Sequence, residues 1–252
     1  MTKHLCIALL LFAACKGSDS SKQSAKASTQ EPAAAADPWA KKSASDIKDP
    51  KLARLVELAT NGPGKTQYPQ ADAVVALERD DITYMADGTI VTKHHSIVKL
   101  LDPQRGKDKF ADLKIPYDSK RETLTIETAR TVNANGKAEV ASKDEIGDIV
   151  PPIVADATMY SDVRERVVTF PAVDTGSVLE LEYTRTTKAT PDSPLGGIQM
   201  LGRWNPVLER VVTITAPAGV TPRLAVEGQK LDPKQSTAGA NGVWTFKLDN
   251  LP

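Results

Sequence analysis

Apolar and polar residues alternate along most of the chain after residue 72, with the two-residue period of a β-strand. In residues 177–185 (SVLELEYTR), Leu179, Leu181 and Tyr183 fall on one face, while glutamate and threonine fall on the other. This pattern is typical of a half-buried antiparallel strand. Two more segments place apolar residues on one face, namely Leu124, Ile126 and Val132 in residues 122–132, and Leu208, Val212 and Ile214 in residues 208–216.

Turn signals separate these strands. Asp87-Gly88 and Asn135-Gly136 each predict a hairpin between two alternating segments. Three further strands are expected at residues 163–170, 221–226 and 243–248. About ten strands with turns between them, and no long helical period after residue 60, predict an all-β fold, a large antiparallel β-sandwich.

Residues 49–62 are the exception, because they predict one short amphipathic helix. Asp49 can cap the helix with Pro50 at its first position, and Asn61-Gly62-Pro63 ends it. Its apolar residues recur at helical spacing at Leu52, Leu55, Val56 and Ala59. We expect this apolar stripe to pack on the sandwich.

The first residues have the pattern of a secretory signal. Residues 1–14 contain a basic start and a short apolar run that is too short to span a bilayer, which needs about 20 residues. Ala13-Ala14-Cys15 resembles the lipobox of bacterial lipoproteins, although Phe12 stands where leucine is usual. The resemblance implies cleavage before Cys15, lipidation of its thiol and anchoring in the cell envelope.

The segment after the cysteine suits a tether. Residues 15–48 are rich in serine, alanine, lysine and glutamine and lack an apolar period, so we expect a flexible segment. In lipoproteins, aspartate directly after the cysteine retains the protein at the inner membrane. Lys16 occupies that position here, and by resemblance it favours the outer membrane. The expected membrane partner is therefore reached through the N-terminal lipid.

Charge and cysteine content remove several functions. The chain of 252 residues has 32 lysines and arginines and 32 aspartates and glutamates, which argues against a nucleic-acid partner. Its two cysteines are Cys6, inside the signal, and Cys15. A lipidated Cys15 leaves no cysteine nucleophile and no cysteine ligand for zinc. We therefore expect no metal and no cofactor.

Four blocks in fixed order resemble a known bacterial family. They are YPQADAVVALERDDITYMADGTIVTKHHSIVKLL, IPYDSKRETLTIETARTVNANGKAEV, YSDVRERVVTFPAVDTGSVLELEYT and RWNPVLERVVTITAPAG. Residues 68–252 are similar to the domain of unknown function 3857, which is found ahead of transglutaminase-like domains in secreted proteins. The resemblance implies a β-sandwich outside the cytoplasm that accompanies a transglutaminase-like peptidase.

The sequence leaves three functions open, of which the first two follow from this resemblance. The preferred one is a non-catalytic envelope module that binds or positions a protein or cell-wall partner. A second is the N-terminal part of a longer transglutaminase-like enzyme, whose Cys, His and Asp would lie beyond Pro252. A third is a module that binds cell-wall carbohydrate, for which an exposed Trp204 is the best candidate contact.

Few side chains suggest chemistry within the sandwich. His94 and His95 are neighbours in an expected strand, so they should point to opposite faces and cannot bind one metal together. Arg130, Arg164 and Arg166 could bind an anionic group, although ion pairs with strand glutamates explain them better. No residue is expected to be catalytic.

Overall fold

The computed structural model describes residues 6–10 and 50–252, apart from 103, 134, 158–161, 191–195 and 229; for 6–10, 50 and 155–157 it describes the backbone alone. Cys15 and the expected tether lie outside the described residues. The elements are β1 (Cys6–Leu10), α1 (Pro50–Asn61), β2 (Ala73–Tyr84), β3 (Ile90–Leu100), α2 (Arg105–Phe110), β4 (Asp112–Asp118), β5 (Glu122–Val132), β6 (Ala138–Val140), η1 (Lys143–Glu145), β7 (Ile146–Ile149), η2 (Pro152–Ala157), β8 (Val163–Thr169), β9 (Val178–Thr187), β10 (Gly196–Met200), β11 (Val207–Ala216), β12 (Lys234–Ala238) and β13 (Asn241–Leu251).

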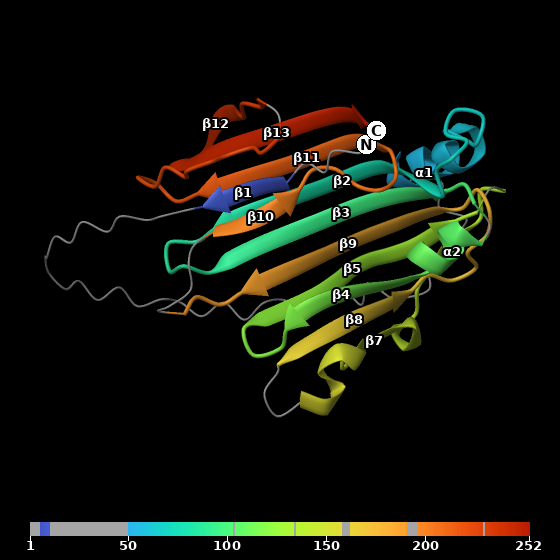
Figure 1. The fold of residues 1–252 in the computed structure, drawn as a ribbon, viewed down its shortest axis with the longest axis horizontal. Coiled ribbons are helices and arrows are strands. Elements are labelled where there is room, and N and C mark those ends of the chain that lie inside the picture. Colours follow the sequence, from blue (N-terminus) through green and yellow to red (C-terminus); the bar gives the residue numbers. More distant parts are fainter. Residues whose placement is uncertain are drawn as a thin grey trace, which may run out of the picture.

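The fold is an all-β sandwich with short helices (Figure 1). Its main layer is an eight-stranded sheet in the order β12-β13-β11-β2-β3-β9-β5-β6. Neighbouring strands run antiparallel except β11 and β2, which pair in parallel. Both expected hairpins are present, and Gly88 and Gly136 supply the positive φ, 86° and 81°, that their turns require.

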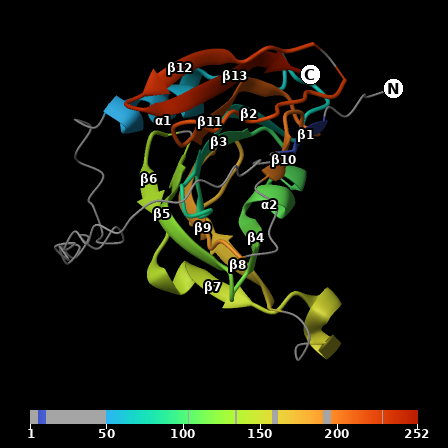
Figure 2. The ribbon, with the colours of Figure 1, turned by 90° about the vertical axis from the view of Figure 1, so that its left-hand side faces the viewer.

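The second layer consists of two separate pieces on one face of the large sheet, here called the inner face. Figure 2 shows the three-stranded sheet β4-β8-β7 folded across β5 and β9, with β10 and its partner β1 farther along the same side. Between these two pieces, part of the inner face formed by β2, β3 and β9 has no strand above it.

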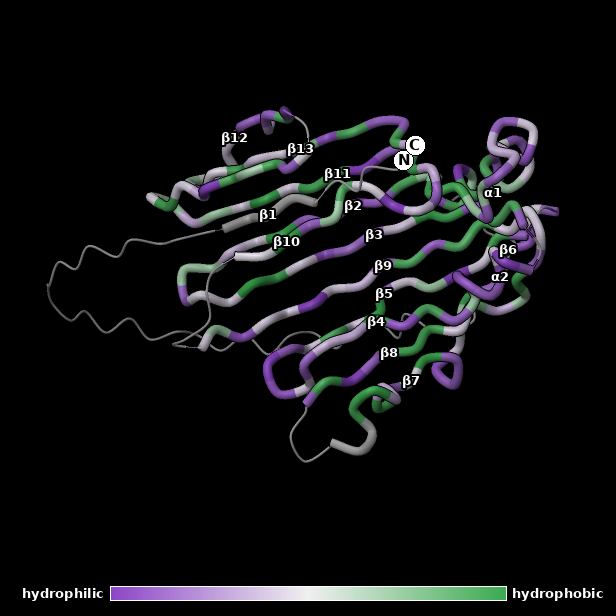
Figure 3. Tube along the Cα trace, in the orientation of Figure 1, coloured by the Kyte–Doolittle hydropathy of each residue, from purple (hydrophilic) through white to green (hydrophobic). Residues whose placement is uncertain are grey.

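Three apolar cores hold these layers together, and Figure 3 shows the alternation of hydrophobic and hydrophilic residues along the strands that supply them. The first lies between the two sheets, where Leu179 and Leu181 of β9 pack with Ile115 of β4 and Val168 of β8. The second lies farther along the inner face, around Val212. The third lies on the opposite, outer face beneath α1.

The helix α1 docks on the outer face as its apolar stripe predicts. Leu55 and Ala59 are buried in the third core. The ammonium group of Lys99, on β3, donates to the carbonyls of Leu58, Ala59 and Gly62 at 2.8, 3.2 and 3.1 Å. These carbonyls lie in and just after the last turn, where the helix leaves carbonyls without amide donors, so Lys99 both caps α1 and fastens it to the sheet.

Two expectations about strand faces are wrong, and in β5 the cause is a bulge, through which strict alternation does not hold. The register of β5 against β9 shifts between Ile126 and Thr128. Ile126 therefore enters the first core, whereas Val132 enters the third core on the opposite face. In β11, Leu208 likewise packs toward the third core, away from Val212.

Residues 221–226 do not form the expected strand. Pro222 lies in this segment, which has an irregular backbone without ladder partners among the described residues. Leu224 and Val226 nevertheless pack on the second core, so the segment covers the sheet without extending it. Alternation also did not predict the short helices α2, η1 and η2 or the strands β1, β4, β7, β10 and β12.

Within the described part of the chain, no helix combines the length and the apolar character needed to cross a bilayer.

Candidate binding groove

A groove of about 570 Å³ opens on the inner face, a size that suits a small-molecule or short-segment ligand. Apolar side chains predominate in its lining. The floor comes from β2, β3 and β9, one wall from α2 and β4, and the other wall from the loop between β10 and β11. Representative lining residues are Ser96, Val98, Leu179 and Leu181 on the floor, Phe110 and Lys114 on one wall, and Arg203 and Trp204 on the other.

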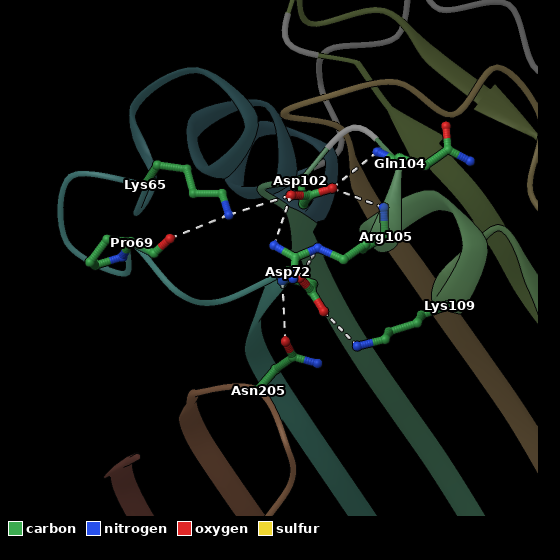
Figure 4. A network of polar contacts seen from close by, with 9 residues as sticks. Lys65, Pro69, Asp72, Asp102, Gln104, Arg105, Lys109 and Asn205 are labelled. Atoms are coloured by element: carbon green, nitrogen blue, oxygen red, sulfur yellow. Dashed lines mark hydrogen bonds and ion pairs between the residues drawn. The ribbon is translucent and has the colours of Figure 1, made fainter.

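The two walls are pinned at one end of the groove, as Figure 4 shows. The carboxylate of Asp72, just before β2, accepts from Lys109 of α2 at 2.5 Å and pairs with Arg105 at 3.1 Å. The side-chain oxygen of Asn205, from the opposite wall, accepts the N–H of Ala73 at 3.3 Å. Both walls are therefore anchored to the same end of β2, which keeps the groove open before a ligand arrives.

A charged network, here called the inner cluster, lies where the floor meets the second core. It comprises Glu78, Asp80, His94, Arg203 and Arg210. The guanidinium of Arg210, with only 1% of its side chain exposed, lies 2.6 Å from Asp80 and also donates to backbone carbonyls. Arg203 binds Glu78 through two nitrogens. Each acid is thus matched by one arginine.

His94 is oriented by the same network. Its Nδ1 lies 2.7 Å from Asp80, and its ring stacks on Tyr183 with 4.7 Å between centroids. Burial acts to raise the pKa of Asp80, but the hydrogen bond from His94 and the charge of Arg210 together outweigh burial and lower that pKa below its ordinary value. Because the ionised carboxylate only accepts, Nδ1 of His94 carries the proton. Burial raises the pKa of Tyr183 to about 12, which keeps its hydroxyl protonated.

A second network, here called the outer cluster, lies on the opposite face and borders a cavity of about 420 Å³. It comprises Lys51, Arg130, His95, Glu180 and Glu182. Buried Glu180 accepts from Arg130 at 2.5 Å and lies 2.9 Å from His95. Burial would raise the pKa of Glu182, but the Thr128 hydroxyl and the charges of His95 and Lys51 lower it below its ordinary value.

Both clusters contain three side chains whose ligand atoms lie within 4.8 Å of one another, the spacing of a metal site. These are Glu78, Asp80 and His94 on the inner face, and His95, Glu180 and Glu182 on the outer face. The carboxylate oxygens, however, already accept from arginine, lysine, histidine or threonine donors. A divalent ion would have to displace these cations, so the donor sets fit ion-pair networks better than metal centres.

The residues singled out from the sequence lie in different places. His94 and His95 do point to opposite faces, as their adjacency in a strand predicts. Arg130 pairs with Glu180, whereas Arg166 pairs with Asp148, 2.6 Å away on β7, and Arg164 donates to the carbonyl of Val163. Of these residues, His94 and Trp204 line the groove, and Trp204 is 84% exposed. A ligand-binding role for any of these residues remains a prediction.

Several groove residues had no signal in the sequence. Lys114 and Phe110 belong to elements that the alternation did not reveal, and Arg203 precedes a turn. The groove arises because β4 and the β10–β11 loop meet over the same floor from distant parts of the chain. Where β2 and β11 pair, Arg210 stands opposite Glu78, and Asp80, its ion-pair partner, lies two residues farther along β2. These charged residues were the one detectable hint, and it needed knowledge of that pairing.

Comparisons with known proteins add the following. Residues 86–252 match the model of a Domain of Unknown Function with a solved structure, DUF3857. No curated protein matches the chain. A solved structure of a "putative protease" from Parabacteroides distasonis ATCC 8503 is similar over 72% of this chain and 36% of that one, with 21% identity and a TM-score of 0.64.

A second solved structure, an M1 zinc metallopeptidase from Deinococcus radiodurans, is similar over 71% of this chain and 39% of that one, with 12% identity and a TM-score of 0.38. The chain thus spans between a third and two fifths of the length of these two proteins. The first likeness shows the shared β-sandwich fold.

Proposed function

The chain belongs to the DUF3857 family, and we propose that it is a non-catalytic binding module whose inner groove holds the apolar part of a ligand. The observation that supports this most strongly is the groove itself, with an apolar floor and anchored walls. Preformed, mostly apolar grooves with a few placed polar groups are the usual form of a binding site. Trp204 stands exposed at the rim, where a large aromatic ring can close over a ligand.

The proposal extends to a place in the cell and a working partner. We place the module in the bacterial cell envelope, at the outer membrane, held there by a lipid on Cys15 and a tether over residues 15–48. Cleavage before Cys15 would remove β1, so β10 alone would remain of that piece of the second layer. There the module would present its ligand to a transglutaminase-like peptidase, on this chain or on another one. The support for this context is the lipobox-like Ala13-Ala14-Cys15 and the resemblance of residues 68–252 to domains that precede such peptidases.

Filling the groove should weaken binding without unfolding the protein. Ser96 is half-buried and lies on the floor of the groove, which Glu78 and Val98 also line. In Ser96→Phe a phenyl ring takes the space, and a ligand then loses about 1.5–3 kcal/mol of apolar contact, at least about tenfold in affinity. The dye anilinonaphthalene sulfonate, titrated by fluorescence, measures this, since its rings suit the floor and its sulfonate suits the basic rim.

A matched control is Thr125→Phe, which adds the same ring to an exposed position of β5 outside the groove. We expect this variant to bind the dye like the wild type, and both variants to keep the wild-type thermal midpoint within a few degrees. Equal dye binding by all three proteins would show that the dye does not use the groove and would count against the proposed function.

Lipidation is tested separately. Cys15→Ser removes the thiol that a lipidating enzyme needs, so the variant should leave the detergent phase and appear in the aqueous phase after detergent partitioning of expressing cells. The control is Lys16→Asp, which changes the residue next to Cys15 but keeps the thiol. This variant should stay in the detergent phase. A Cys15→Ser variant that partitions like the wild type would rule out the anchor.

A further inference from the structure

We propose that the groove takes an extended peptide segment that adds as a strand to the free edge of β4, with alternating apolar side chains and an acidic group at one end. The inference rests on the proposed function and names the ligand class of the same groove. Three features of the described residues support it: the open edge of β4, the spacing of the floor and the distribution of charge.

The edge of β4 is open at the groove. β4 pairs with β8, and the bonds from Phe170 N–H to the Ala111 carbonyl (2.8 Å) and from Ser119 N–H to the Asp162 carbonyl (2.9 Å) fix which residues bond across that ladder. Odd-numbered residues of β4 bond to β8, so even-numbered ones direct N–H and C=O away from it. Among these, Lys114 lines the groove, and its backbone has no hydrogen bond within the described part of the chain.

The neighbouring edge positions confine pairing to a short stretch. Pro116 has no N–H, and its carbonyl already accepts from Arg185 of β9 at 2.8 Å. Proline and lysine on an edge are the usual means of preventing unlimited strand addition. A short peptide bonded to Lys114 is compatible with these residues, whereas a long sheet-to-sheet association is not.

The floor fits a strand in that position. Val98, Leu179 and Leu181 face the groove from neighbouring strands. A peptide residue opposite Lys114 has its side chain on the same side as Lys114, toward solvent, because directly paired residues share a face. The residues on either side of it then direct their side chains to the apolar floor. This geometry selects alternation of apolar and polar residues and corresponds to strand addition, an established mode of peptide recognition.

The charges favour an acidic end. Cations at the groove are Lys109, Lys114, Arg185 and Arg203, against one acid, Glu78. Lys109 and Arg203 are bonded to Asp72 and Glu78. Lys114 pairs with no acid in the described part of the chain, and Nε of Arg185 is buried there without a hydrogen-bond partner. Arg185 also lies 4.0 Å from Glu122. A carboxylate at the Lys114–Arg185 end would give Lys114 a counter-charge and give Nε of Arg185 an acceptor.

The test uses the full chain and the peptide acetyl-Thr-Val-Thr-Val-Thr-Val-Asp with a free C-terminal carboxylate. Methylation of the backbone amide of the second of the three threonines removes the N–H that would reach the Lys114 carbonyl. Methylation of the amide of the valine that follows it removes an N–H that points away from β4. We expect the first change to weaken binding about tenfold and the second to weaken it little. The Lys114 amide should also become at least about tenfold more protected from hydrogen exchange when the peptide binds.

Two variants separate backbone pairing from charge. Lys114→Gln removes the charge alone, so peptide affinity should fall a few-fold and lose much of its salt dependence. Lys114→Pro removes the N–H as well, and should bind about tenfold more weakly than Lys114→Gln. An edge position that points away from the ladder tolerates proline, and an unchanged thermal midpoint confirms that the variant is folded.

Each outcome decides one of the two proposals. Equal binding of both methylated peptides, or of both Lys114 variants, overturns strand addition. Dye binding that is sensitive to Ser96→Phe, together with no peptide binding, also overturns strand addition but leaves the groove as a binding site. Absence of both dye and peptide binding overturns the proposed function and this inference with it.

Discussion

Asp80→Asn is expected to lower the free energy of unfolding by about 3–5 kcal/mol at neutral pH. The reason is Arg210, whose side chain is only 1% exposed and whose guanidinium lies 2.6 Å from Asp80. Its other contacts are backbone carbonyls, which carry no net charge. The neutral amide would leave a buried cation without its counter-charge. Urea denaturation at about pH 7 measures the effect.

The pH dependence gives the same prediction a second readout. The pKa of Asp80 lies below its ordinary value of 3.8 in the folded protein. Its contribution to stability is therefore complete above that value and is lost as the pH falls through the lower, folded-state pKa. The difference in stability between wild type and Asp80→Asn should be constant near neutral pH and should shrink below about pH 4.

Asp81→Asn is the matched control. Asp81 is the next residue, half-buried on the outer face, and no ion pair or hydrogen bond joins its side chain to the described residues. Its substitution should change stability by less than about 0.5 kcal/mol. Equal effects of the two substitutions would mean that Arg210 does not depend on Asp80.

Arg130→Leu should have an effect of similar size on the other face. Glu180 is 1% exposed, and Arg130 supplies a bond to it at 2.5 Å. Without Arg130, the carboxylate keeps only His95 from the outer cluster as a partner. Breaking a buried pair by removing one partner leaves an uncompensated charge, and we expect a loss of about 3–5 kcal/mol in urea denaturation.

The double variant Arg130→Leu, Glu180→Leu distinguishes this cause from lost packing. Replacement of both members of a buried ion pair by apolar residues is often neutral or stabilising. The double variant should therefore unfold at a higher urea concentration than Arg130→Leu alone. If the second substitution instead lowers stability further, the glutamate contributes in its own right and the unpaired charge does not explain the loss.

Strand periodicity predicted the side of the sheet on which several residues of the two clusters lie, but it did not predict the groove. Adjacent histidines in a strand must face opposite sides, and this is how His94 and His95 come to serve separate networks. Alternation also predicted that Leu179 and Leu181 share a face. It failed at Val132, because a bulge after Ile126 adds one residue to β5 and reverses the facing of everything beyond it.

The groove could not be predicted, because it depends on which strands are missing from a layer. β4 and α2 are short and show little hydrophobic periodicity, so the local sequence does not predict an open strand edge at Lys114. Trp204 was expected to be exposed, and it is, but its position at a groove rim depends on Asn205, which ties the β10–β11 loop to Ala73. Such contacts join residues more than 100 positions apart in the chain.

The most direct test of the proposed groove is the position of the bound dye on the sheet. Nuclear Overhauser contacts between anilinonaphthalene sulfonate and assigned methyl groups of the full chain would measure this. We expect contacts with Val98, Leu179 and Leu181, which line the groove on the inner face. Contacts with Leu77 and Ile97 instead, which line the cavity on the outer face, would contradict the proposed function and place binding beside the outer cluster.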